Sequence, residues 1–234
     1  MSGTIALVGA GEFLPAMVEL DKSLLATTGR PRPRVAIVPT AAYPDGEMIF
    51  RRWAAMGVEH FRSLGAEVEA VLVRNRAEAD DPVNAQAVGE ADLIYFSGGK
   101  PEHLLEAFEG SATWSATCAA HRRGAILVGC SAGAMVLASS RFVVRPRLGW
   151  PFGWRPGLGV VENAAVVPHY DTMPEPLAVL MTFGAPAGTA ILGIDGGTAL
   201  VGRDGSFQVH GRSRVTVWRG RRRERHQVGD IVRI

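Results

Sequence analysis

The sequence predicts an α/β fold in which helices cover both faces of a mostly parallel sheet. Over the first two-thirds of the chain, short apolar runs alternate with segments of helical periodicity, an order typical of parallel sheets with helical crossovers. Beyond residue 190 the apolar runs are separated by glycine-rich turns such as Asp204-Gly205, which indicates an antiparallel edge. No long linker divides the chain, so residues 1–234 are expected to form one domain.

The elements follow in order from this pattern. Buried parallel strands are expected where apolar runs end in small or turn-forming residues, at Thr4–Val8, Arg34–Val38, Asp92–Phe96 and Ala125–Cys130. A further strand is expected at Glu67–Val73, where polar and apolar residues alternate. Helices are expected between and after them, at Leu14–Thr28, Gly46–Leu64, Glu102–Phe108, Trp114–Arg123 and Ala132–Ser139. The later strands are predicted at Gly159–Val167, Ala190–Ile194, Thr198–Val201, Phe207–Val209 and Val215–Trp218.

Composition excludes several classes of protein. A hydrophobic content of 47% in 234 residues excludes a disordered chain. Two cysteines, Cys118 and Cys130, offer neither a disulfide framework nor a zinc module. The N-terminus lacks a signal-peptide pattern, and glycine and proline at residues 184–188 interrupt the longest uncharged run, Pro176–Ile194. We therefore expect a cytoplasmic protein that does not bind a membrane.

The net charge of +2 conceals an uneven distribution. Residues 110–161 contain no Asp or Glu but six arginines. Base composition of the genome is one explanation. The other is a segment that faces an anionic ligand, because arginine binds carboxylate or phosphate with two parallel hydrogen bonds. In that case Arg145 and Arg147 are candidate substrate-binding residues.

The most specific local signal is Gly129-Cys130-Ser131-Ala132-Gly133, between an apolar strand and a helical segment. In that context the G-x-S-x-G pattern predicts a nucleophile elbow, in which the serine hydroxyl projects at the carboxyl end of the strand. The N–H groups that begin the next helix, at Ala132, would favour an oxyanion. Cys130 is interpreted as a packed apolar residue. The pattern also arises by chance.

A serine nucleophile needs a base, and His169 is the best placed of six histidines. Pro168-His169-Tyr170-Asp171 directly follows the apolar run Ala164–Val167, so His169 stands at the strand edge where α/β sheets bind ligands. A purely structural histidine is the alternative.

Ser97-Gly98-Gly99 follows a third strand. Two glycines permit close approach of the backbone to a substrate, at Gly98, and can supply a second oxyanion N–H. An ordinary strand-to-helix turn is the alternative. Gly9-Ala10-Gly11 does not complete a dinucleotide fingerprint, because Leu14 occupies its last glycine position, and no phosphate loop is present. No cofactor or metal is expected.

Five segments in order resemble one family. They are Val8–Pro15, Tyr95–Gly99, Gly129–Ala134, Pro168–Asp171 and Gly193–Leu200. Together they resemble the dipeptidase E and cyanophycinase family of serine peptidases, over roughly residues 4–202. The resemblance implies the class I glutamine amidotransferase-like fold, a three-layer flavodoxin-like sandwich. It also implies Ser131 as nucleophile, His169 as base, oxyanion N–H groups from Gly99 and Ala132, and a small amide or dipeptide substrate without metal.

The chain departs from the family pattern at four places. Residues 146–149, where the resemblance implies the triad acid, hold no carboxylate, which leaves Glu162 and Asp171 as candidates. Pro101 replaces a common glutamine, Gly196 replaces a common glutamate, and Thr172–Pro176 replaces an arginine-rich stretch. The substrate specificity of the family therefore does not transfer.

Two alternatives to a hydrolase remain. A catalytically weakened relative would bind a small anionic ligand or a partner through the arginine-rich segment 122–155. Arg219–Arg225 could contact nucleic acid, although without interleaved aromatic residues it is more typical of a solvated turn or a protected edge strand, so no nucleic-acid partner is expected. Trp150 and Trp154 lie in a Gly/Pro-rich loop that could form an apolar lid or a homodimer contact.

Overall fold

The computed structural model describes residues 3–144 and 152–234, which form two sheets. The larger sheet has eight strands in the order β14-β11-β10-β1-β5-β4-β2-β3. Its strands are β1 (Ile5–Val8), β2 (Arg34–Val38), β3 (Glu67–Ala70), β4 (Leu93–Phe96), β5 (Ile126–Cys130), β10 (Thr198–Arg203), β11 (Ser206–Gly211) and β14 (Ile231–Arg233). The smaller sheet has six strands in the order β13-β12-β9-β8-β6-β7. These are β6 (Ala138–Val144), β7 (Phe152–Pro156), β8 (Val161–Val167), β9 (Ala190–Ile194), β12 (Arg214–Arg219) and β13 (Arg222–Gln227).

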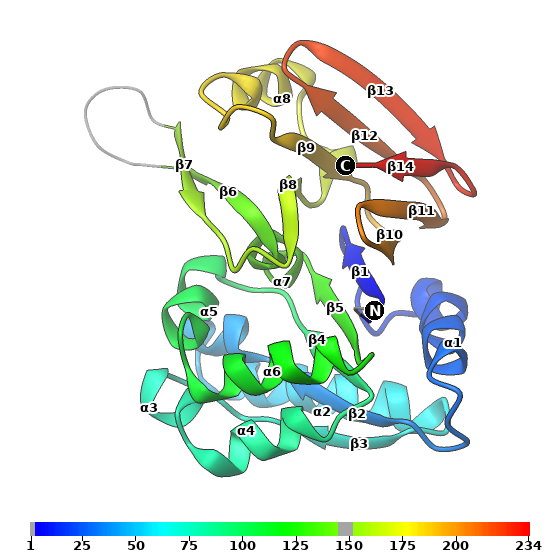
Figure 1. Ribbon diagram of the computed structural model, residues 1–234, viewed down its shortest axis with the longest axis vertical. Coiled ribbons are helices and arrows are strands. Elements are labelled where there is room, and N and C mark those ends of the chain that lie inside the picture. Colours follow the sequence, from blue (N-terminus) through cyan, green and yellow to red (C-terminus); the bar gives the residue numbers. More distant parts are fainter. Residues whose placement is uncertain (1–2, 145–151) are drawn as a thin grey trace.

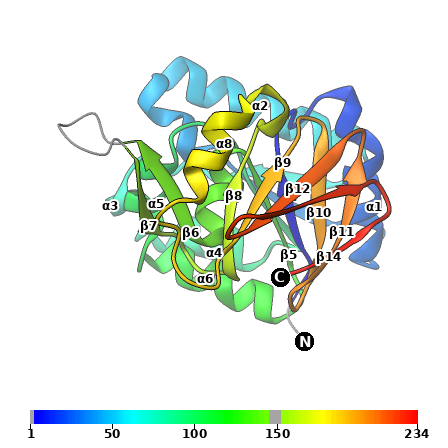
Figure 2. The ribbon, with the colours of Figure 1, turned by 90° about the horizontal axis from the view of Figure 1, so that it is seen from above.

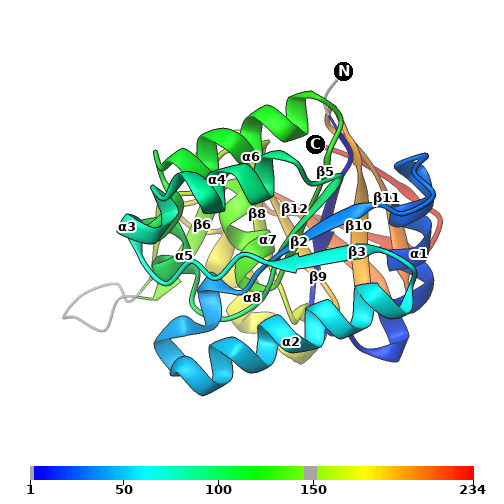
Figure 3. The ribbon, with the colours of Figure 1, turned by 90° about the horizontal axis from the view of Figure 1, so that it is seen from below.

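Helices cover the parallel part of the larger sheet on both faces (Figure 1). The helices of the described residues are α1 (Val18–Thr27), α2 (Glu47–Ser63), α3 (Arg76–Ala79), α4 (Pro82–Gly89), α5 (Pro101–Phe108), α6 (Ala112–Arg122), α7 (Ala132–Leu137) and α8 (Glu175–Thr182). Of these, α8 packs on the smaller sheet, where Met181 contacts the cluster of Val167, Ile191 and Trp218. Seen from below, α2 lies on one side of β2 and β3, and α4 and α6 lie on the other (Figure 3). This is the three-layer arrangement that the family resemblance implies.

Strand pairing confirms the mostly parallel sheet and its antiparallel extension. The four neighbouring pairs from β1 to β3 are all parallel, whereas β10 runs antiparallel to β1 and leads to β11 and β14. Because parallel strands end at the same edge of a sheet, the loops after β1, β4 and β5 converge there.

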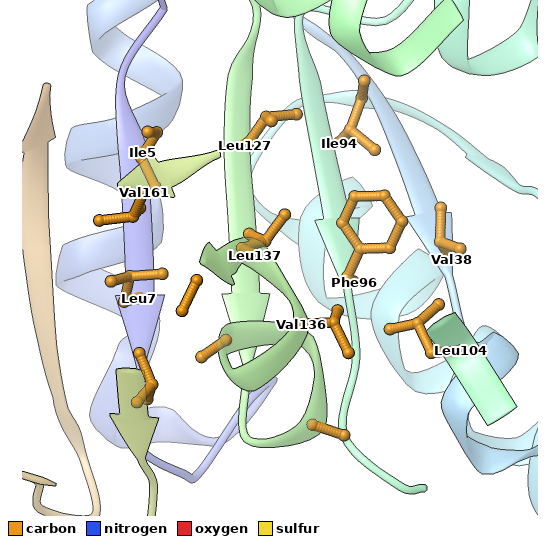
Figure 4. Packing of buried hydrophobic residues seen from close by; sticks show 14 of the residues in the cluster. Ile5, Leu7, Val38, Ile94, Phe96, Leu104, Leu127, Val136, Leu137 and Val161 are labelled. Atoms are coloured by element: carbon orange, nitrogen blue, oxygen red, sulfur yellow. The ribbon is translucent and has the colours of Figure 1, made fainter. Parts of the chain in front are cut away.

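Alternating side chains divide the core between the two faces. In β1, Ile5 and Leu7 pack into the cluster that contains Phe96 of β4, whereas Ala6 and Val8 pack against α1 and α2. Figure 4 shows the first cluster, in which Val136 of α7 lies above the strands. Successive side chains of a strand point to opposite faces, so these uninterrupted apolar runs suit a sheet buried on both sides.

The smaller sheet differs most from the prediction. In Figure 2, β6 and β7 lie on one side of β8, and β9 and β12 lie on the other. The helix expected over Ala132–Ser139 ends at Leu137, because β6 begins at Ala138 and pairs with β8. Part of the predicted Gly/Pro loop is strand β7, which is stabilised by pairing with β6 and by the edge-to-face contact of Phe142 with Trp154.

The arginine-rich C-terminal stretch forms most of β13, an edge strand. Charged side chains at a sheet edge oppose pairing with other chains. Among the helices in the described ranges, none is both long and apolar enough to cross a membrane.

Candidate active site

Ser131 and His169 meet at the carboxyl edge of the strands. Ser131 directly follows β5 of the larger sheet, and His169 lies two residues beyond β8 of the smaller sheet. Ser131 Oγ lies 3.0 Å from His169 Nε2, which is hydrogen-bond distance between a hydroxyl and an imidazole nitrogen. The structure therefore brings together the two side chains that the sequence proposed as nucleophile and base.

The backbone at Ser131 adopts a sharp strand-to-helix turn, with φ 50° and ψ −110°. The glycines of the motif permit it. A Cβ on Gly129 would lie 2.6 Å from the carbonyl carbon of Gly133, and a Cβ on Gly133 would lie 2.2 Å from the oxygen of Phe96. No larger residue fits at either position, which gives the G-x-S-x-G spacing a steric reason.

The loop that carries His169 is fastened to β9 and β12. The Tyr170 ring covers Gly193, where an added Cβ would lie 2.4 Å from the ring, and the Tyr170 hydroxyl accepts a hydrogen bond from Trp218 Nε1 at 2.8 Å. The Thr172 N–H and hydroxyl both donate to the carbonyl of His169. These contacts fix a histidine whose own φ is 52°.

The backbone N–H groups of Gly99 and Ala132 have no hydrogen-bond acceptor among the described residues. Ala132 is the first residue of α7, so its N–H has no partner within the helix. Gly99 has φ 138°, and a Cβ there would lie 2.1 Å from the oxygen of Ala41. A glycine is therefore required at 99, and its N–H remains available. Because α7 has only six residues, its helix dipole contributes little to the stabilisation of an oxyanion.

Glu12 is a buried acid near the site that the sequence analysis did not identify. It is 6% exposed, accepts a hydrogen bond from the Gly98 N–H at 2.8 Å through Oε1, and accepts another from Cys130 Sγ at 2.8 Å through Oε2. The N–H of Gly98 is therefore occupied, and the close approach of a substrate to the Gly98 backbone stays a prediction. An acid directly after Gly9-Ala10-Gly11 was the available signal.

Cys130 behaves as a packed residue. It is fully buried, and its Sγ donates a hydrogen bond to the buried Glu12. Burial, followed by the negative charge of Glu12, raises the pKa of the Cys130 thiol well above its ordinary value. A thiol that stays protonated is a poor nucleophile.

The expectation that Glu162 completes a triad is wrong. Glu162 is the second residue of β8, whereas His169 lies beyond the other end of that strand. At about 3.3 Å per residue, roughly 16 Å separates Glu162 from the strand's last residue. Its side chain lines a surface depression of about 710 Å³ together with Trp114 and His121.

Asp171 is close to His169 in sequence but is bonded elsewhere. Its Oδ1 accepts a hydrogen bond from the Gly196 N–H at 2.7 Å. A Cβ on Gly196 would make ordinary van der Waals contact with the same oxygen, at 3.5 Å. Within the described residues, no carboxylate is hydrogen-bonded to the His169 ring.

Two of the described arginines of the acid-free segment, Arg123 and Arg141, are bonded away from Ser131 and His169. Arg123, which follows the last residue of α6, donates a hydrogen bond to the carbonyl of Gly89 at the end of α4. Arg141 is 8% exposed, and its guanidinium is paired with Glu102 at 2.6 Å. Arg145 and Arg147 lie outside the described residues. In the part of the chain that the structure describes, no group of three or more His, Cys, Asp or Glu is arranged to hold a metal ion.

Comparisons with known proteins point to one family. Peptidase family S51 matches residues 5–210. A crystal structure of a peptidase from an acI-B1 Actinobacterium is similar with a TM-score of 0.88 at 31% identity, covering 100% of this chain and 98% of that one. A putative peptidase E from Listeria monocytogenes EGD-e shares the fold, with a TM-score of 0.61 at 17% identity, covering 98% of this chain and 100% of that one. None of the curated proteins matches.

The family match covers most of the chain, including the segments that carry Ser131 and His169. The related actinobacterial peptidase is similar over the whole length. The chain therefore belongs to peptidase family S51 and is a serine peptidase.

Proposed function

We propose that the protein hydrolyses an amide bond of a small peptide with Ser131 as nucleophile and His169 as general base. The observation that carries the proposal is the 3.0 Å separation of Ser131 Oγ from His169 Nε2 at the edge where the strands end. With the imidazole proton on Nδ1, the serine hydroxyl donates to Nε2.

The reaction has two halves. Ser131 Oγ attacks the carbonyl carbon while its proton passes to His169 Nε2, and the N–H groups of Gly99 and Ala132 stabilise the oxyanion. The imidazolium then returns the proton to the leaving amine, which departs as the acyl-serine forms. His169 then takes a proton from water, which attacks the acyl-serine carbonyl. The imidazolium gives this proton to Ser131 Oγ as the ester bond breaks, which releases the acid and restores the free serine.

Labelling with a fluorophosphonate tests this assignment. We expect one equivalent of label on Ser131, identified by peptide mapping, and no label on Ser131→Ala. Cys130→Ala is the matched control, because it changes the neighbouring residue without removing the proposed nucleophile, and it should label like the wild type. Absence of labelling between about pH 6 and about pH 9 would contradict the proposal.

A further inference from the structure

An apolar pocket of about 270 Å³ lies among the elements that carry Ser131 and His169, and its lining includes Pro168, the residue before His169. Its walls come from α7, β6, the end of β8 and α8. Its lining residues in the described ranges are all apolar, among them Met135, Phe142, Val167, Leu177 and Met181. In this pocket no charged or hydroxyl-bearing side chain from the described residues faces the space.

The pocket shares its walls with the elements that carry the catalytic pair. Met135 lies one turn into α7 and donates its N–H to the carbonyl of Ser131 at 3.0 Å, so the two residues lie on the same side of the helix. Pro168, also in the lining, immediately precedes His169. A substrate whose carbonyl reaches Ser131 can therefore extend a neighbouring side chain into this pocket.

Among the described residues, no arginine lines this pocket. Phe142 lines it, whereas the preceding residue, Arg141, is paired with Glu102 of α5. Successive residues of a strand face opposite sides, so the guanidinium of Arg141 is directed away. An acidic side chain placed here would lose its hydration without gaining a partner.

The shape of the pocket suits a flexible apolar side chain. Met135, Met173 and Met181 line it, and methionine adapts to irregular partners because its side chain is unbranched. Leu177 and Met173 are only half-buried, so apolar surface remains accessible beside the site. Covering it with an apolar group removes that surface from water.

We propose that this pocket selects substrates with an apolar side chain, of the size of leucine, methionine or phenylalanine, next to the scissile bond. This inference rests on the proposed function, because it uses Ser131 to locate the scissile bond. It assigns Met135, Phe142, Leu177 and Met181 as residues that determine specificity.

Dipeptide hydrolysis tests the inference. The set is Leu-Ala, Ala-Leu, Ala-Ala, Asp-Ala and Ala-Asp, so that each side of the bond is probed. In one of the two positions, leucine should raise kcat/KM over alanine by roughly 50-fold, as expected for burying the additional carbons, and aspartate should not. Equal rates for leucine and alanine in both positions, or preference for aspartate, would overturn the inference.

A matched pair of variants locates the effect. Leu177→Arg puts a cation into the pocket wall and should remove most of the leucine preference. Val179→Arg makes the same change on the same helix at an exposed position outside the pocket lining and should keep it. If both variants retain the preference, the pocket does not select the substrate.

A binding measurement separates failure of this inference from failure of the proposed catalytic residues. In the Ser131→Ala background, calorimetry should show that the preferred leucine dipeptide binds at least tenfold more tightly than Ala-Ala, and that Leu177→Arg removes the difference. This result would support the pocket even if Ser131 failed to label with fluorophosphonate. Equal affinities would overturn the pocket even if Ser131 labelled normally.

Discussion

Ser131 combines a strained backbone with the proposed nucleophile. Its φ of 50° and ψ of −110° lie outside the regions that a side chain favours, and such a residue costs on the order of 1–3 kcal/mol. The hydrogen bond from the Ser131 N–H to the carbonyl of Val8 and the packing of Gly129 and Gly133 hold it in place. The strain aims the hydroxyl at His169.

This strain predicts a difference between two inactive variants. Ser131→Gly relieves the backbone, whereas Ser131→Ala retains it, so we expect the glycine variant to be more stable by about 1 kcal/mol. Urea unfolding monitored by circular dichroism gives the comparison. If the alanine variant is the more stable of the two, the conformation at 131 carries no strain.

Asp171 provides the second residue-scale prediction. Since its carboxylate is bonded to the Gly196 N–H and not to His169, we expect Asp171→Asn, which preserves the acceptor oxygen, to lower kcat less than tenfold. Asp171→Ala removes the anchor of the His169 loop and should lower kcat more. A triad acid would behave differently, because its replacement by asparagine costs about 10⁴ in kcat. A loss of that size in Asp171→Asn would make Asp171 the third catalytic residue.

At the scale of elements, α1 and α2 are joined by a buried polar pair. Asp21 Oδ2 lies 2.7 Å from His60 Nε2, and the two side chains are 1% and 7% exposed. The Phe13 ring packs against His60 with centroids 5.8 Å apart. Burial raises the pKa of the Asp21 carboxyl above its ordinary value of 3.8, and the His60 contact opposes this shift without reversing it.

The raised pKa of Asp21 predicts a pH dependence of stability. A carboxyl whose pKa is higher in the folded state contributes stability that is complete below pH 3.8 and is lost as the pH rises through the folded-state pKa. The free energy of unfolding of the wild type, relative to that of Asp21→Asn, should therefore decline as the pH rises from 3.8 through the folded-state pKa of Asp21. Denaturant unfolding at a series of pH values measures it.

Glu19→Gln is the control for this experiment, because Glu19 lies on the same helix and its side chain is 86% exposed. The difference in free energy of unfolding between Glu19→Gln and the wild type should stay nearly constant with pH. A wild-type advantage over Asp21→Asn that grows with pH would mean that the ion pair with His60 outweighs burial.

At the scale of the whole molecule, the two sheets depend on the C-terminal strands. The family match ends at residue 210, yet β12 lies beyond it and pairs with β9, which in turn pairs with β8. Val215 and Val217 are fully buried, and Trp218 also holds Tyr170 beside His169. The C-terminal strands therefore help to hold the loop that carries His169.

Deletion of residues 212–234 should abolish stable folding. Burial of a large apolar side chain contributes about 1.5–3 kcal/mol, so loss of Val215, Val217 and Trp218 alone approaches the total stability of a typical protein, about 5–15 kcal/mol. Thermal unfolding followed by circular dichroism tests this. The full-length double variant Arg221→Gln and Arg222→Gln is the control and should unfold like the wild type, since both residues are exposed. A cooperative transition of the truncated chain at the wild-type temperature would contradict the prediction.

The sequence by itself determined the α/β class and the parallel strands, and it pointed to Ser131 and His169 as the proposed nucleophile and base. Each of these inferences depends on local signals. Apolar runs mark buried strands, and small residues around Ser131 mark the turn. The same local signals did not reveal β7 in a segment rich in glycine and proline, since pairing with β6 and the contact of Phe142 with Trp154 stabilise it.

Only the tertiary structure decided which groups surround the pair. Glu162 was a candidate from its place in the chain, but the direction of β8 carries it to the opposite end of the strand. Glu12 lies 86 residues from Gly98 along the chain and is nevertheless hydrogen-bonded to it. The apolar pocket draws on four separate elements. Such contacts depend on how strands cross and sheets pack, and a linear pattern records only which residues are near in sequence.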